Sequence, residues 1–349
     1  MSSDDIGQLL VVRWPEPRWG AALERTLKRY EPAGVMLPLQ RPESPESTAE
    51  TLGRIKDAVS VPPLLWPDDI RIADRLTGML PSPRAAAEAG PVVVEKLADL
   101  KGQGLRLLGF NSYVGPNLDL VPPNAGGIFT DRAFSSSAQT TTQYGTIFLQ
   151  QLRRHGIAPC PGSFPGLGEA SGARLDHLIV VQRPMASLWS EDLVPFREVL
   201  PRLRLIWISP GAYKAFDYEP LKPAPFSERI LEGLLRVRLG YRGAAVAAPF
   251  AVGVGVQRLT VGQAAVRAIN AGCDLLVANG DIELFQALAA VQEALETGLL
   301  SQERVEEALA RVRSAKEGLA LPSGNLSSTE WESFINGCEQ FGGELQAPK

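Results

Sequence analysis

The chain has 349 residues, 45% of which are hydrophobic, and a formal net charge of −4, so it is long enough for one large domain or two ordinary ones. The slight acidity, and the absence of any basic run with interleaved aromatics, argue against nucleic-acid binding. No apolar run reaches the roughly eighteen residues that a membrane span needs, so none is expected.

Short apolar runs alternate with longer amphipathic stretches along most of the chain. The apolar runs favour strands and the amphipathic stretches favour helices. The expected strands cover 8–14, 34–39, 62–66, 109–120, 157–162, 204–209, 244–250 and 274–280. The expected helices cover 20–30, 44–59, 82–104, 135–156, 192–203, 227–240, 260–272, 281–298 and 301–321.

This alternation predicts an α/β fold with parallel strands. Eight strand candidates within residues 1–321 match a closed (β/α)8 barrel of the TIM type better than an open, doubly wound sheet. The open sheet is the second possibility, but no Gly-x-Gly-x-x-Gly follows the first strand. Residues 322–349 are polar and rich in Gly and Ser, which predicts a partly ordered tail with one short helix at 328–339.

The cysteines and histidines point to no special chemistry. Cys160, Cys273 and Cys338 are widely spaced, which predicts reduced thiols rather than a disulfide framework. The two histidines stand 22 residues apart and offer no ligand cluster, so neither a metal nor a cofactor is expected. The acidic start with its short apolar run predicts no secretory signal, and the expected setting is the cytoplasm. The oligomeric state is left open.

In a barrel of this kind, functional side chains follow the C-terminal ends of the strands. Ordinary structural roles compete at each position, because a polar residue there can also cap a helix or close a turn. The segment 159–184 is rich in glycine and proline, and we expect a mobile excursion over the barrel mouth. The candidates from these ends are Asp68, Asp69, Asn117, Asp119, Arg132, Ser163, Glu169, Asp176, His177, Ser209, Ala248, Asn279 and Asp281.

Several stretches, taken in order, resemble motifs of one enzyme family. "GFNSYVGPNLDL" is similar to the motif "GINLNFAPVLDV", "TDRAFSSS" to "GxRSFG", and "GSFPGLGE" to "KHFPGHGD". "LVPFREVL", "PAPFSERILEGLLRVRLGYRG" and "AAVRAINAGCDLLV" match further motifs of the same series. Over roughly residues 6–320 the chain therefore resembles family 3 glycoside hydrolases, in particular the single-barrel β-N-acetylglucosaminidases. The resemblance implies a (β/α)8 barrel.

The chain departs from the family pattern at the positions to which the resemblance assigns the chemistry. The family's nucleophilic aspartate, in "VISDDL", aligns with Ala248, and a retaining glycosidase needs a carboxylate there. The lysine and histidine of "KHFPGHG", which hold sugar hydroxyls, align with Gly162 and Ser163, and the histidine of the sixth strand is replaced near Ser209. The resemblance therefore implies a degenerate active site.

Other family positions keep a polar side chain. The resemblance makes Arg75 and Arg132 sugar-binding arginines, and Asp176 with His177 a remnant acid/base pair. In this chain the aspartate stands next to the histidine, whereas in the family it stands two residues before it. The aspartate of "DxEGG" aligns with Pro67, and a one-residue slip lets Asp68 or Asp69 replace it.

Two functional hypotheses follow. The first is a β-N-acetylhexosaminidase-like barrel that lacks the retaining mechanism and binds a sugar or peptidoglycan fragment, or acts as a protein scaffold. The second is an active O-glycosyl hydrolase with relocated carboxylates, in which Asp68 or Asp69 works with Glu169, His177 or Asp281 as proton donor. Glu169 is also a candidate for substrate binding. Neither hypothesis requires nucleic acid or a membrane.

Overall fold

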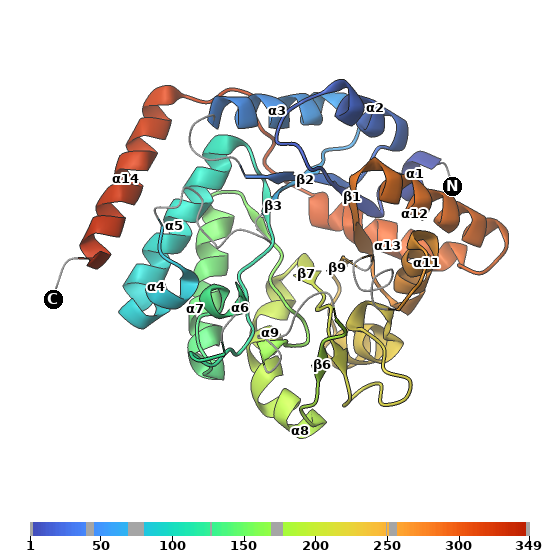
Figure 1. Cartoon of the computed structure of the whole chain (residues 1–349). Coiled ribbons are helices and arrows are strands. Elements are labelled where there is room, and N and C mark those ends of the chain that lie inside the picture. Colours follow the sequence, from blue (N-terminus) through green and yellow to red (C-terminus); the bar gives the residue numbers. More distant parts are fainter. Residues whose placement is uncertain are drawn as a thin grey trace.

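The computed structural model describes residues 3–39, 45–68, 80–125, 128–168, 177–248, 250 and 257–346. Six parallel strands form one curved sheet in the order β3-β2-β1-β10-β9-β7 (Figure 1). Every neighbouring pair in that sheet is parallel, as expected for strands joined by helices. The bounds are β1 Leu10–Arg13, β2 Gly34–Pro38, β3 Leu64–Asp68, β7 Leu205–Trp207, β9 Ala244–Ala247 and β10 Leu275–Asn279.

Two short strands join the ends of this sheet and complete the ring. On one side, the Asn111 amide donates to the Leu65 carbonyl of β3 at 3.3 Å; on the other, the Trp207 amide of β7 donates to the Pro161 carbonyl at 2.8 Å. These eight strands stand in the predicted chain order, and the predicted TIM-type barrel is confirmed. The joining strands are β4 Ser112–Tyr113 and β5 Ala158–Pro159, which pair in parallel.

Helices cover the outside of the barrel (Figure 1). The predicted helix at 82–104 is two helices, because Gly90 takes a positive φ of 112° and Pro91 has no backbone N–H to continue the first one. The helix that precedes β9 is η5 Arg229–Arg238, and the helix that precedes β10 is α11 Val261–Ala271. The other helices around the barrel include α2 Ala21–Tyr30, α3 Pro45–Ala58, α4 Pro83–Ala89, α5 Pro91–Leu108, α6 Ile128–Arg132, α7 Ala138–Arg154, η2 Leu188–Asp192, α9 Leu193–Val199, α12 Gly280–Glu296 and α13 Gln302–Lys316.

Side chains alternate between two apolar cores along each strand. Val11 of β1 and Trp66 of β3 pack inside the barrel, whereas Val12 and Leu65 pack between the sheet and the helices. This period of two is the ordinary geometry of a strand. It decides which residue at each strand end faces the interior of the barrel.

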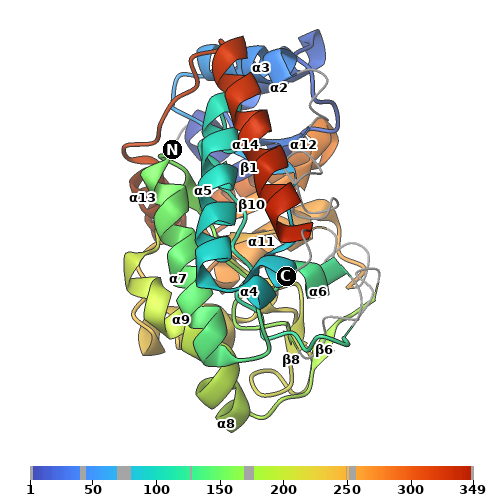
Figure 2. The same cartoon turned by 90° about the vertical axis from the view of Figure 1, so that its left-hand side faces the viewer.

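The polar C-terminal stretch forms a longer helix than predicted. α14 covers Ser328–Gln346 rather than 328–339, and it lies against α5 (Figure 2). Its side chains Trp331, Phe334, Cys338 and Phe341 recur at helical spacing and are buried. An apolar stripe within a polar composition therefore docks this helix onto the barrel.

Candidate functional site

Four strand ends place side chains at the C-terminal mouth of the barrel. Arg13, Asp68, Ala248 and Asn279 each stand two residues beyond an inward-facing residue of β1, β3, β9 or β10. Arg13 and Asn279 are register partners on adjacent strands. The strand period thus places these four residues at the same end of the barrel interior, the position of chemistry in barrels of this kind.

Asp68 is held by an arginine. Arg13 Nε lies 2.6 Å from Asp68 Oδ2, and Arg13 Nη2 lies 2.9 Å from Asp68 Oδ1. This is a two-pronged, charge-assisted pair between side chains that are only 17% and 11% exposed. Arg13 Nη1 also donates to Asn279 Oδ1 at 3.4 Å. Both carboxylate oxygens of Asp68 are therefore engaged, which reduces their ability to attack carbon.

Arg13 was not among the residues expected from the sequence. It closes the apolar run "QLLVVRW", where strand periodicity places every second residue inside the barrel. A charged residue at an inward strand end was the signal that could have identified it. Its partner Asp68 lies 55 residues away, so the pairing itself needed the fold.

Ala248 offers only a methyl group at the mouth. It is half-buried and packs against the interior core, which includes the half-buried Trp207. The nearby Ser209 is fully buried, and its hydroxyl oxygen accepts from Tyr213 Oη at 2.7 Å and from the Gly211 amide at 3.0 Å. Ala248 and Ser209 both lack a carboxylate, and the Ser209 hydroxyl already accepts two hydrogen bonds. Neither residue can therefore replace the nucleophile.

Asp119 anchors the first part of the 159–184 segment. It is buried and accepts from the Leu167 amide at 2.8 Å and from Asn117 Nδ2 at 3.0 Å. Burial raises the pKa of Asp119, and these hydrogen bonds oppose the rise. Residues 159–168 are buried throughout, and Asp119 accepts a hydrogen bond from their backbone, so this part of the segment argues against the expected mobility, which stays a prediction.

A second buried carboxylate lies on the other side of this segment. Asp192, at the end of η2, is 2% exposed, and Arg183 Nε lies 3.0 Å from its Oδ2. The pKa of Asp192 is raised to about 6: burial raises it most, the charge of Arg183 opposes the rise, and the nearby charge of Asp119 adds to it. A Cβ on Gly166, which has a φ of 121°, would come within 2.8 Å of the Asp192 Cβ. Sequence reasoning missed Asp192, although an aspartate opening "DLVPFREVL" was visible.

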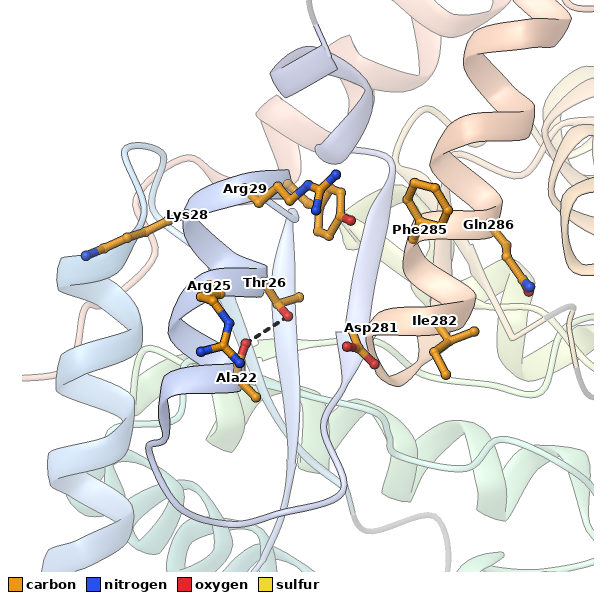
Figure 3. A pocket seen from close by; sticks show the side chains of 10 residues that line it. Ala22, Arg25, Thr26, Lys28, Arg29, Asp281, Ile282, Phe285 and Gln286 are labelled. Carbon is orange, nitrogen blue, oxygen red and sulfur yellow. Dashed lines mark hydrogen bonds between the residues drawn. The ribbon is translucent and has the colours of Figure 1, made fainter.

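The remaining candidates are scattered. His177 is exposed ahead of the short strand β6 Val180–Val181, and Arg132 is half-buried at the end of α6. Asp281 is exposed and lines a groove between α2 and α12 (Figure 3). It does not face the barrel interior, because Gly280 turns the chain out of β10 with a φ of 71°. The positions that lie outside the described residues are Asp69, Arg75, Glu169 and Asp176.

Within the ranges that the structure describes, no three His, Cys, Asp or Glu side chains form a group suited to a metal ion. Helices long and apolar enough to cross a membrane are absent from the same ranges. The second histidine, His155, lies on the helical layer, where its Nε2 is 2.8 Å from Asp99 Oδ1. It is the C-cap residue of α7 and precedes β5, so it lies before the N-terminal end of that strand and not at the mouth.

Comparison with known proteins gives one family. The model of the glycosyl hydrolase family 3 N terminal domain matches residues 1–315. A beta-hexosaminidase of Methylococcus capsulatus is 29% identical over 75% of each chain, and beta-hexosaminidase A of Pseudoalteromonas piscicida is 25% identical over 73% of this chain and 46% of its own. The chain thus spans less than half of the second relative. A family 3 beta-N-acetylglucosaminidase from Paenibacillus sp. superimposes with a TM-score of 0.81 at 23% identity, covering 97% of this chain and 68% of that one.

Proposed function

Because the chain belongs to glycosyl hydrolase family 3, we propose that it is a β-hexosaminidase-like barrel that binds a sugar at its mouth but lacks the covalent retaining mechanism. The observation that carries the proposal is the methyl group of Ala248 at the inward end of β9. The sequence resemblance assigns the nucleophilic carboxylate to this position.

The missing carboxylate matters because of how retaining glycosidases work. They use two carboxyl groups about 5 Å apart, one of which forms a covalent bond to the sugar. A methyl group has no electron pair to donate, so this first step has no nucleophile. The change from aspartate to alanine also removes the negative charge that would stabilise the cationic transition state.

The proposed ligand is an N-acetylhexosamine or a peptidoglycan fragment that contains one. The names of the relatives, beta-hexosaminidase in each case, support this class. Gly162 and Ser163 stand where the family resemblance expects lysine and histidine, so charge-assisted hydrogen bonds worth about 1.5–3 kcal/mol each are missing. We therefore expect affinity for N-acetylglucosamine in the millimolar range or weaker. The proposed setting is the cytoplasm, which the three buried free thiols support.

Asp68 keeps a second candidate open, an active hydrolase with a relocated nucleophile. In its favour, Asp68 is an inward-facing carboxylate at the mouth and is still 11% exposed. Against it, both of its oxygens are held by Arg13. The two candidates differ in whether the unmodified chain turns over substrate and in whether Asp68 is needed for it.

The test uses a β-N-acetylglucosaminide with a 2,4-dinitrophenyl leaving group, which departs without a general acid. We expect negligible turnover by the unmodified chain and measurable turnover after Ala248→Asp, because the variant restores a carboxylate. Ala248→Asn is the matched control: it has nearly the same shape without the charge, and it should stay inactive. Turnover by the unmodified chain that Asp68→Asn abolishes would replace this proposal with the relocated mechanism.

A separate measurement tests sugar binding. Backbone amide shifts are followed while N-acetylglucosamine is titrated, and the expected shifts cluster at the strand ends around Ala248. Arg132→Ala should weaken the binding, since the resemblance makes Arg132 a sugar-binding side chain. Micromolar binding that is unaffected by Arg132→Ala would place the pocket elsewhere.

A further inference from the structure

An amphipathic groove lies on the outside of the barrel, between α2 and α12 (Figure 3). Its volume is about 710 Å³, and it shares Arg29, Tyr30 and Phe285 with a smaller neighbouring hollow. Ile282 and Phe285 of α12 are 69% and 49% exposed, although both are large apolar side chains. The groove therefore leaves apolar surface in water next to charged side chains.

The side chains of α2 give the groove a basic rim. Arg25 and Arg29 line it, and the Arg29 guanidinium stacks on the ring of Tyr30 with 5.2 Å to the ring centroid. Neither arginine forms an ion pair with any residue in the described ranges, whereas the neighbouring Lys28 pairs with Glu24 at 2.7 Å. Two cations beside exposed apolar side chains fit an occupant that carries carboxylates next to apolar groups.

The exposed face of α12 carries that same combination. Ile282, Phe285, Ala289, Glu293 and Glu296 recur at spacings of three and four residues, so they lie along one face of the helix. Along this face the apolar half, Ile282 to Ala289, comes first and the acidic half, Glu293 and Glu296, follows. In the described part of the chain neither glutamate is ion-paired; Glu296 only accepts from Gln292 Nε2 at 3.2 Å.

The relative direction of two α12 helices determines whether the arginines of one copy can meet the glutamates of another. Figure 3 shows that α2 and α12 run side by side, with Ala22 and Ile282 at one end and Arg29 and Phe285 further along. A second copy related by a two-fold axis would lay its α12 antiparallel to the first. With the axis near residues 286–287, the apolar halves face each other, and Arg25 of each copy lies opposite Glu293 of the other.

We propose that two copies of this chain pair through the groove between α2 and α12, with the two α12 helices antiparallel. The exposed apolar side chains form the centre of the contact, and the unpaired arginines and glutamates form its rim. This arrangement is self-complementary, as a two-fold interface must be. It uses none of the mouth residues, so it is independent of the proposed function.

Sedimentation velocity of the full chain tests the pairing between about 1 and 100 μM, a range that suits a modest interface. The expected result is a reversible dimer. Ile282→Asp should abolish it, because two carboxylates would enter the apolar centre. Val237→Asp is the matched control: Val237 of η5 is 82% exposed and lies outside the groove, so the dimer should persist. A chain that is monomeric throughout this range, or a dimer that Ile282→Asp leaves intact, would overturn the proposal.

A charge swap tests the orientation. Arg25→Glu and Glu293→Arg should each weaken the dimer about tenfold or more, because each places like charges together at two symmetric positions. The double variant restores both opposite pairs and should regain affinity to within about threefold of the unmodified chain. A double variant no tighter than the single ones would contradict the antiparallel arrangement.

Crosslinking gives a readout that does not depend on affinity. Gln286→Cys should form a disulfide-linked dimer on mild oxidation, since Gln286 is exposed, the two copies of this position face each other near the axis, and the native cysteines are all buried. Val237→Cys should stay unlinked. Equal crosslinking of both variants would refute the location. Amide shifts in the groove on adding an acidic amphipathic peptide, with the chain monomeric, would assign the groove to a different protein.

Discussion

Replacing Asp192 by asparagine should stabilise the protein at neutral pH. Asp192 carries its charge in a buried site beside the mouth, and burial raises its pKa from 3.8 to about 6. The attraction of Arg183 offsets only part of this effect. Asparagine keeps the shape of the side chain and removes the buried charge. Arg183 keeps a second partner in Glu191, so the variant leaves no isolated cation.

The size of the effect follows from the pKa difference. At a pH below the unfolded pKa of 3.8, both folded and unfolded chains hold the proton, and Asp192 carries no penalty. As pH rises the unfolded chain ionises first, so the folded state loses stability until pH passes the folded pKa of about 6. The full difference of about 2 pKa units corresponds to about 3 kcal/mol. Between about pH 4.5 and pH 7.5, the stabilisation by Asp192→Asn should grow by about 2 kcal/mol.

Urea unfolding, followed by tryptophan fluorescence at several pH values, measures this growth. Glu191→Gln is the matched control, because it removes one carboxylate from the same Arg183 at a site that is 54% exposed. Its effect should be small, within about 0.5 kcal/mol, and nearly independent of pH. A flat difference for Asp192→Asn, or a variant that loses stability relative to the unmodified chain as pH rises, would refute the role of burial.

Three further changes test the packing around the site and the C-terminal helix. Gly168→Ala should lower the free energy of unfolding by about 1–3 kcal/mol, because the new Cβ would lie 2.0 Å from the Leu120 carbonyl oxygen; an unchanged thermal midpoint would show that the backbone there adjusts freely. Phe334→Ala should cost about 3–5 kcal/mol in urea unfolding, since Phe334 is buried against the barrel; a loss below about 1 kcal/mol would mean that α14 is not part of the cooperative unit. The Leu167 amide should be protected in hydrogen exchange and lose that protection in Asp119→Ala; rapid exchange in the unmodified chain would contradict the anchoring by Asp119.

The class of fold and the order of its strands could be predicted from the amino-acid sequence alone. Apolar periodicity depends only on neighbouring residues, so the eight strand positions were predictable. Their ends were less so. The strand predicted at 62–66 ends two residues later because Asp68 is paired in register with Pro38 of β2. The strand expected at 157–162 is only Ala158–Pro159, since the prolines at 159 and 161 have no N–H for a regular ladder.

The sequence also determined one feature of the site, the methyl group of Ala248, because an absent carboxylate needs no geometry to be recognised. Which polar groups meet, in contrast, depends on how the chain folds in three dimensions. Arg13 pairs with Asp68 across 55 residues, and Asp281 turns away from the mouth into an outer groove. Asp192 gains its raised pKa from burial beside Gly166, which no local pattern contains. Periodicity fixes which face of a strand or helix a residue occupies. Contacts between distant strands and loops depend instead on how the barrel closes. That closure brings together residues whose spacing in the chain does not indicate that they will be in contact.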